Sequence, residues 1–117
     1  KVGTVIVNSG NVVMATGYNG PPRGTCDDMT DRKRKLLRVI HAEENAILFA
    51  RTDLRGCTMY VTHHPCCHCA AVIVQAGITR VVHPVTHPDL FDRWHEQFNE
   101  ARLLFRTVKV QHIEVAS

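Results

Sequence analysis

His41-Ala42-Glu43 and, further along the chain, Pro65-Cys66-Cys67-His68-Cys69 contain three residues of the kinds that bind zinc. Cys66 and Cys69 stand at i and i+3, so they share one face at the start of a helix, and His41 supplies a third donor. Structural zinc sites have four protein ligands, whereas catalytic sites have three and keep the fourth position for water. Glu43 is not needed as a ligand and is placed to move a proton of that water. The two stretches therefore predict an open catalytic zinc site, with one ion per chain.

Outward from these two stretches, strand-like and helix-like segments alternate. Helices are expected to begin at His41 and near Cys66, and Gly77 is expected to close the second one. The expected strands are residues 2–7, 12–18, 58–62, 79–83 and 108–115, and the expected helices are residues 41–51, 67–75 and 90–105. This order predicts an α/β fold, in which one mixed five-stranded sheet begins with an antiparallel hairpin and carries helices on both faces, in three α/β/α layers. Strands joined through helices should be parallel with right-handed crossovers, which brings both helix N-termini to one end of the sheet.

The composition is that of one small globular domain, residues 1–117, with 44% hydrophobic and 21% charged residues. The net charge of +3 is mild and gives no reason to expect nucleic-acid binding. No apolar run has the roughly 20 residues of a membrane span and no signal peptide is visible, so we expect no membrane partner and a cytoplasmic location. Five cysteines, clustered around residues 66–69, indicate metal binding in a reducing compartment rather than a disulfide framework. Because Lys1 leads directly into a strand-like run, we expect an N-terminal element to precede it.

Two neighbouring carboxylates compete for the role of proton carrier. The H-x-E spacing favours Glu43, in the same helical turn as His41, whereas Glu44 is expected to face solvent or a neighbouring subunit. Ala42 between them is small, so its backbone N–H can approach a substrate carbonyl. Asn19, in the glycine-rich turn after the second strand, is a candidate substrate contact, with an ordinary turn residue as the alternative.

Other cysteines and histidines leave several interpretations open. His64, Cys67 or His68 could complete a closed structural zinc site, but that interpretation leaves Glu43 without a role. Cys67 and His68 are otherwise bystanders, and Cys26 is a ligand, a reactive thiol or neither. Cys57 is expected to be a buried strand residue. Four other histidines have no metal-ligand spacing and are expected to be structural or surface-exposed: His83, His87, His95 and His112.

The residues around the zinc motif resemble the deoxycytidylate deaminases of the cytidine deaminase superfamily. Gly17-Tyr18-Asn19-Gly20-Pro21-Pro22-Arg23-Gly24 is similar to that family's loop after the second strand, and residues 41–47 are similar to its H-A-E-x-N-A-I helix start. The resemblance continues through residues 58–69 and 77–82, and the C-terminal third matches in outline only. It implies a cytidine deaminase-like fold.

The resemblance implies zinc-dependent hydrolytic deamination of dCMP to dUMP with release of ammonia, which supplies dUMP for thymidylate synthesis. It makes His41, Cys66 and Cys69 the zinc ligands, Glu43 the proton carrier and Asn19 a contact of the substrate sugar or base. It also implies a homo-oligomer, often a hexamer, with activation by dCTP, inhibition by dTTP and binding of an effector as its Mg²⁺-nucleotide.

Several side chains are candidates for the remaining substrate contacts. Arg23 is the first candidate for the phosphate, because it is a cation beside the glycine-rich loop. The basic run of residues 31–35, with Arg38, is a second candidate for the phosphate or a solvated face. His64 is a further candidate substrate contact.

Two departures from the family are visible. His83 and His87 stand where relatives often have tyrosines, which changes the substrate-facing contacts expected there. Relatives with a second zinc bind it through residues that precede the first strand, so that second site is not expected here. The alternative functions are a tRNA adenosine, nucleoside or free-base deaminase within the superfamily, and a non-catalytic zinc-folded module outside it.

Overall fold

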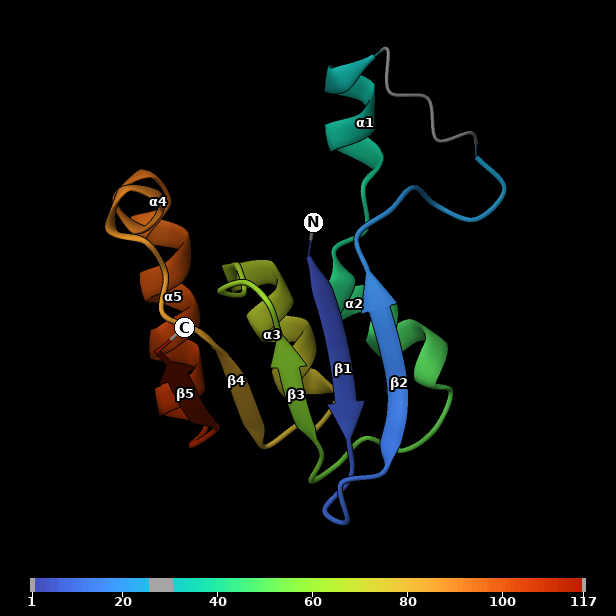
Figure 1. Ribbon diagram of the computed structural model, residues 1–117, viewed down its shortest axis with the longest axis vertical. Coiled ribbons are helices and arrows are strands. Elements are labelled where there is room, and N and C mark those ends of the chain that lie inside the picture. Colours follow the sequence, from blue (N-terminus) through green and yellow to red (C-terminus); the bar gives the residue numbers. More distant parts are fainter. Residues whose placement is uncertain (1, 26–30, 117) are drawn as a thin grey trace.

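The computed structural model describes residues 2–25 and 31–116. Five strands form one sheet, and helices occupy the connections that follow the second strand (Figure 1). The strands are β1 (Gly3–Val7), β2 (Val13–Tyr18), β3 (Thr58–Val61), β4 (Arg80–Pro84) and β5 (Gln111–Val115). The helices are α1 (Arg32–Arg38), α2 (Ala42–Ala50), α3 (Cys67–Gln75), α4 (Pro88–Arg93) and α5 (His95–Thr107). None of the helices in these residues has the length and apolar character needed to cross a membrane.

The sheet is mixed, with the strand order β2-β1-β3-β4-β5. β1 is antiparallel to both of its neighbours, whereas β3, β4 and β5 are parallel to one another. The predicted hairpin and the parallel strands joined through helices are therefore confirmed. Val81 of β4 lies opposite Met59 of β3 and His112 of β5. Because side chains alternate along a strand, residues 81, 83, 112 and 114 share one face of the sheet.

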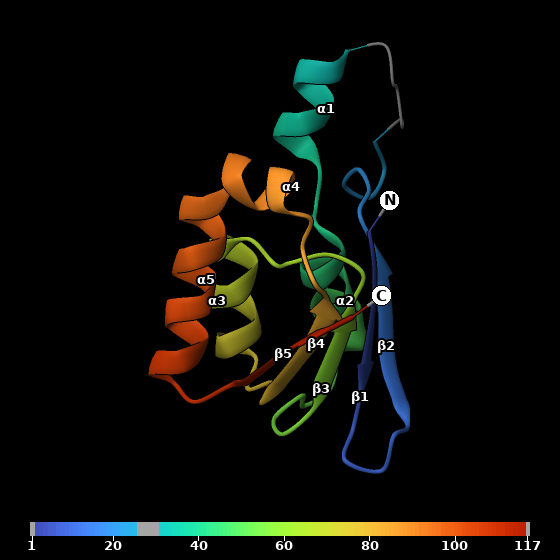
Figure 2. The ribbon, with the colours of Figure 1, turned by 60° about the vertical axis from the view of Figure 1, so that its left-hand side comes forward.

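The helices α2, α3 and α5 lie on the same side of the sheet (Figure 2). The three connections all move in one direction across the sheet, from β2 past β1 to β3, then to β4 and then to β5. Right-handed crossovers that move in one direction place their helices on one face. The described part of the chain therefore differs from the expectation of helices on both faces, and its other face carries exposed side chains such as Tyr18 and Tyr60.

The core lies between the sheet and this helical layer. Ile6, Met59 and Val81 point into it from three neighbouring strands, and Ile73 of α3 and Phe105 of α5 pack against them. Full burial of a side chain of this size stabilises a fold by about 1.5–3 kcal/mol. The core therefore fixes α3, whose first turn carries the cysteine-rich stretch, against the sheet.

The C-terminal helical region contains two helices where the spacing of apolar residues predicts one. Pro88 is the first residue of α4, and Nδ1 of His87 accepts a hydrogen bond from the backbone N–H of Asp89 at 3.2 Å. Trp94 then has φ −119°, well outside the helical range, and separates α4 from α5. A break of one residue leaves the apolar spacing almost unchanged, so periodicity does not reveal it.

Gly17 is the point at which β2 touches α2. A Cβ atom at this position would lie 2.5 Å from the carbonyl oxygen of Ala42 and 2.6 Å from the backbone nitrogen of Ala46. Both neighbours are backbone atoms, which cannot rotate aside as the end of a side chain can. Gly17 therefore allows the first turn of α2, which carries Glu43, to lie directly on the sheet.

Gly17→Ala is expected to destabilise the protein by about 1–3 kcal/mol, because overpacking forces α2 away from β2. Chemical denaturation followed by circular dichroism measures this change. Gly3→Ala is the matched control, since nothing lies within 4 Å of a Cβ atom at that position. Equal stability of the two variants would show that α2 does not require this close approach.

Candidate functional site

Two helix starts bring the zinc motif together at one end of the sheet (Figure 1). His41 directly precedes α2, and Cys66 directly precedes α3, where its sulfur accepts a hydrogen bond from the backbone N–H of Cys69 at 3.5 Å. The helix α3 runs to Gln75, and Gly77 follows with φ +85°, in agreement with the predicted helix and its glycine terminus. The partial positive charge of a helix N-terminus favours thiolate over thiol at Cys66.

His41, Cys66 and Cys69 converge on one point. Nδ1 of His41 lies 3.3 Å from Sγ of Cys69 and 3.6 Å from Sγ of Cys66. Zn–S bonds of about 2.3 Å and Zn–N bonds of about 2.0–2.1 Å place nitrogen and sulfur ligands of a tetrahedral site about 3.5 Å apart. The three residues therefore fit zinc. Among the residues described, no fourth histidine, cysteine or carboxylate joins this group, so the arrangement is that of an open site.

The two cysteines of this group differ in acidity. Hydrogen bonds from the thiol and the backbone N–H of Cys69 lower the pKa of Cys66 to about 5, with help from His41 and against the effect of burial. The pKa of Cys69 is raised, because its thiol is hydrogen-bonded to Cys66 and is buried. The thiolate form is therefore favoured at Cys66, and a cation bound between the sulfurs would displace the proton held by Cys69.

Glu43 and Glu44 have different surroundings. Glu43 is 4% exposed and lines the same cavity as His41 and Cys66. Burial raises the pKa of Glu43, although a backbone hydrogen bond opposes the change, so its carboxyl takes up a proton more readily than one in water. Glu44 instead lies 3.2 Å from Nε2 of His68 in a partly exposed pair. The geometry supports Glu43, rather than Glu44, as the proton carrier.

A cavity of about 600 Å³ opens beside the three ligand residues. Of the residues singled out in the sequence, its wall contains Asn19, His41, Ala42, Glu43, His64 and Cys66, together with two members of the basic run, Arg32 and Lys35. The wall also contains residues that no motif marks, which reach it from the loop before α3 and from the C-terminal helical region: His63, Trp94, Gln97 and Phe98. A mainly apolar wall with a few converging polar groups is typical of a site for a small molecule.

Backbone hydrogen bonds hold the glycine-rich loop after β2 beside this cavity. Gly20 donates to the carbonyl of Ile40 at 3.1 Å, and Ile40 donates to the carbonyl of Gly20 at 2.9 Å. The bridge ties the loop to the residue that precedes His41. Asn19 consequently lies on the cavity wall, where its Oδ1 accepts a hydrogen bond from the backbone N–H of Val2 at 3.3 Å.

Arg23, the first candidate for the phosphate, packs against α2 and not on the described wall of this cavity. Its guanidinium carbon lies 5.2 Å from the ring centre of Phe49, on α2, and it is absent from the described residues of the cavity wall. Arg32 and Lys35, both on α1, stand on that wall. The structure therefore favours the second of the two candidates for the phosphate.

The other cysteines and histidines near the motif have partners elsewhere. Sγ of Cys67 donates to Oε1 of Gln97 at 2.8 Å, and His68 pairs with a surface carboxylate. Cys57 is buried, as predicted. Cys26, for which a ligand role was one of three possibilities, lies outside the described residues.

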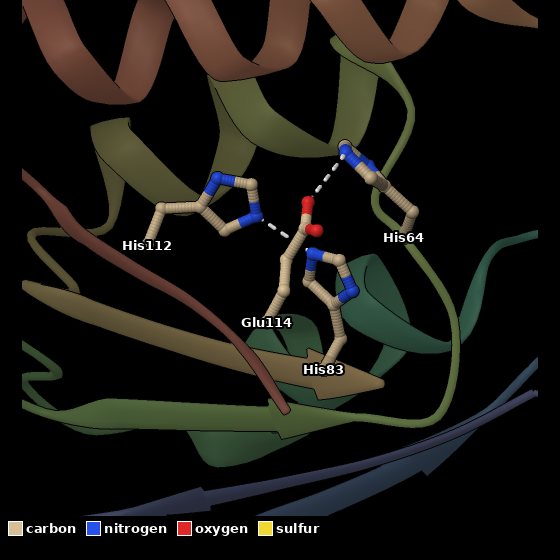
Figure 3. Close-up of side chains that lie close together, drawn as sticks. All are labelled: His64, His83, His112 and Glu114. Carbon is tan, nitrogen blue, oxygen red and sulfur yellow. Dashed lines mark hydrogen bonds and ion pairs between the residues drawn. The ribbon is translucent and has the colours of Figure 1, made fainter. Parts of the chain in front are cut away.

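A second group of titratable side chains adjoins the cavity through His64 and is drawn in Figure 3. His64, from the loop before α3, shares it with His83 of β4 and with His112 and Glu114 of β5. The sequence predicts no partner for His83 or His112, whereas their Nε2 atoms are 2.6 Å apart. Burial lowers the pKa of His64 and of His112 to about 4 and lowers the pKa of His83 as well. Burial therefore favours the neutral form of all three rings.

His64, the further candidate substrate contact, lies on the cavity wall with its ring held between neighbouring side chains. Its side chain is fully buried, and its ring stacks on that of Phe98 with the centroids 4.3 Å apart. Its Nε2 points toward Glu114, into the second group (Figure 3). His64 therefore lines the cavity while its Nε2 faces the second group.

Residues 1–84 match the family model of the cytidine and deoxycytidylate deaminase zinc-binding region. An uncharacterized deaminase encoded in the luxG 3' region of Aliivibrio fischeri is 43% identical over 113 residues, which cover 95% of this chain and 76% of that protein. Deoxycytidylate deaminase of Homo sapiens is 40% identical over 121 residues, which cover 94% of this chain and 65% of the human protein. The crystal structure of dCMP deaminase from the cyanophage S-TIM5, in complex with dCMP and dUMP, has a TM-score of 0.73 and 25% identity over 97% of this chain and 79% of that chain.

These matches include the residues that build the site. The family model spans both stretches of the zinc motif, from the first strand to the end of β4. The bacterial and human relatives extend the match to more than nine tenths of the chain, and the chain spans about two thirds of the length of the human protein. The five-stranded mixed sheet also agrees with the cyanophage structure. This chain belongs to the family of cytidine and deoxycytidylate deaminases.

Proposed function

We propose that this protein catalyses the hydrolytic deamination of dCMP to dUMP with release of ammonia, using one zinc ion per chain. The observation that carries the proposal is a buried Glu43 beside His41, Cys66 and Cys69 on one cavity. A carboxyl next to a three-ligand zinc site is the arrangement of zinc-dependent nucleobase deaminases. The relatives support a nucleotide substrate, since the human protein is a deoxycytidylate deaminase and the cyanophage enzyme was solved with dCMP and dUMP.

His41, Cys66 and Cys69 would hold the zinc ion, which would supply a bound water with its pKa lowered to roughly 7. Glu43 takes a proton from the attacking water and delivers it to the ring nitrogen beside the reacting carbon. It then transfers the second proton to the amino group while the carbon–nitrogen bond breaks, so that ammonia leaves and the water oxygen remains as a carbonyl. The raised pKa of Glu43 suits this work, because the carboxyl must both gain and lose a proton near neutral pH.

Two further groups are placed to orient the nucleoside. Ala42 is the first residue of α2, so its backbone N–H has no partner within the helix and can donate to the carbonyl of the cytosine ring. Asn19, on the wall of the same cavity, can bind the sugar or the base through its amide. Phe98 and Trp94 supply apolar surface on that wall for the base.

The substrate phosphate is proposed to bind at α1. Arg32 and Lys35 are one helical turn apart, and both line the cavity. A charge-assisted hydrogen bond contributes about 1.5–3 kcal/mol, and about 1.4 kcal/mol corresponds to a factor of ten. Two such bonds would therefore favour dCMP over deoxycytidine by roughly 10²-fold or more in kcat/KM.

An ammonia-release screen over dCMP, CMP, deoxycytidine, cytosine and guanine tests this function. We expect the highest kcat/KM for dCMP, and Arg32→Gln should lower that value by about tenfold or more while leaving any turnover of deoxycytidine little changed. Arg34→Gln is the matched control, since Arg34 is on the same helix but pairs with Asp31 at 3.8 Å. Equal kcat/KM for dCMP and deoxycytidine in the native protein would exclude a nucleotide substrate.

We further propose that the protein assembles into a homo-oligomer and that nucleotides control its activity. Leu48 and Phe49 on α2 are 58% and 54% exposed, and neighbouring apolar side chains in such positions support contact with another subunit. Activation by Mg²⁺-bound dCTP and inhibition by dTTP rest on the family resemblance. Light scattering tests the assembly, and the ammonia-release assay with each nucleotide added tests the regulation.

A further inference from the structure

Four donor atoms outside the catalytic site, from His64, His83, His112 and Glu114, all lie within 4.8 Å of one another. We propose that these side chains form a second metal site, which takes a divalent transition cation such as Zn²⁺ and is separate from the His41, Cys66 and Cys69 site. The four residues come from three segments, namely the loop before α3, β4 and β5, and they converge on one point (Figure 3). Their place in the sheet differs from that of a site built by residues preceding the first strand.

The hydrogen bonds of two rings direct a lone pair into this group. Nδ1 of His64 lies 2.9 Å from the carbonyl oxygen of Pro65, and Nδ1 of His83 lies 2.7 Å from that of Pro84. A carbonyl oxygen only accepts, so in both rings Nδ1 carries the hydrogen and Nε2 of the neutral ring carries the lone pair. Histidines that bind metals commonly have this arrangement, with the far N–H held by a backbone carbonyl.

The lone pair of His64 has no partner in the described residues. Its Nε2 is buried without a hydrogen bond, and the nearest carboxylate oxygen, on Glu114, is 4.0 Å away. An acceptor atom that is buried and unpaired costs free energy, and a bound cation would remove that cost. The unpaired atom is thus an observation independent of the clustering, and it points to a ligand at the centre of the group.

His83 and His112 require only a small rearrangement to bind the same ion. Because Nε2 of His83 carries a lone pair, Nε2 of His112 donates in the 2.6 Å contact between them. A cation would replace that hydrogen, which moves to Nδ1 of His112 or to solvent. Zn–N bonds of about 2.0–2.1 Å separate two nitrogen ligands by about 3.3 Å, so the rings would move apart by less than 1 Å.

The chemistry of the four side chains determines which metals they can bind, and the neighbouring Arg102 opposes metal binding. Three imidazoles and a carboxylate suit Zn²⁺ and similar divalent ions, whereas the absence of thiolate among these four residues separates the group chemically from the catalytic one. Arg102 forms an ion pair with Glu114, and its guanidinium lies 4.6 Å from the ring centre of Phe91. Arg102 therefore competes with a cation for the carboxylate.

Binding would join the C-terminal strand to the loop that leads into the catalytic cysteines. His64 is one residue before Pro65-Cys66, while His112 and Glu114 belong to β5 at the edge of the sheet. A ligand that binds only the folded state stabilises it. Occupation of the second site should therefore raise the melting temperature of the protein whose catalytic site is already loaded.

Titration of the zinc-loaded protein with Co²⁺ tests the proposal. We expect uptake of one further equivalent, with visible d–d absorption but without the sulfur-to-cobalt charge transfer that cobalt at Cys66 and Cys69 would produce. His112→Gln should weaken this uptake by at least about tenfold. His95→Gln is the matched control, since it removes an exposed imidazole that lies outside the group.

A second variant is expected to strengthen the binding of Co²⁺ rather than weaken it. Arg102→Gln should tighten the binding of Co²⁺ by about tenfold, because the carboxylate of Glu114 loses a charged competitor. A purely structural histidine cluster would not respond in this way. No second equivalent in the native protein, or equal uptake by the native protein and His112→Gln, would overturn the proposal. Both results are independent of whether the protein deaminates dCMP.

Discussion

Glu43→Gln is expected to lower kcat by at least about 10²-fold, because general acid–base catalysis contributes roughly 10²–10⁴-fold. Glutamine keeps the size of the side chain but cannot take up and release the proton. Glu43 is 4% exposed in the first turn of α2, so an isosteric replacement should leave the helix and the ligands in place. Ammonia release from dCMP measures the loss, and the zinc content of the same sample should be unchanged.

Glu44→Gln provides the control for this experiment. It makes the same chemical change one residue later, at a partly exposed carboxylate that pairs with His68. The variant should retain most of the activity. An inactive Glu44→Gln together with an active Glu43→Gln would reverse the roles assigned to the two residues.

Cys66→Ser is expected to release the zinc and to lower kcat/KM by at least about 10²-fold, since a catalytic metal contributes several kcal/mol of transition-state stabilisation. The substitution isolates the metal ligand from the helix start. Sγ of Cys66 accepts a hydrogen bond from the backbone N–H of Cys69, and a serine hydroxyl is a favourable acceptor at the same position. Metal analysis and ammonia release after gel filtration measure the two effects.

Cys67→Ser makes the identical change at the next residue. Sγ of Cys67 donates to Oε1 of Gln97 at 2.8 Å, and a hydroxyl can donate in its place. We expect this variant to keep both its zinc and its activity. Zinc lost from Cys67→Ser but retained by Cys66→Ser would move the ligand from residue 66 to residue 67.

Local spacing explains why the candidate zinc site could be predicted from the sequence. His41 and Glu43 lie within one turn, and Cys66 and Cys69 lie within another, so helix geometry alone places each pair on a common patch of surface. The order of strands and helices then brings the two helix starts to one end of the sheet. The mixed sheet, the helix from Cys67 to Gln75 and the family resemblance were therefore predictable.

The contacts between residues that are distant in the sequence depend on how the helices and strands pack together. The direction in which Arg23 points and the placement of Arg32 over the cavity depend on where α1 lies, and no local rule fixes that. The group of His64, His83 and His112 needs the parallel pairing of β4 with β5, because a shift of one residue would turn His112 to the other face of the sheet. Register and helix placement arise from burial of the whole core, so contacts across strands and helices are not encoded in the spacing of any single segment.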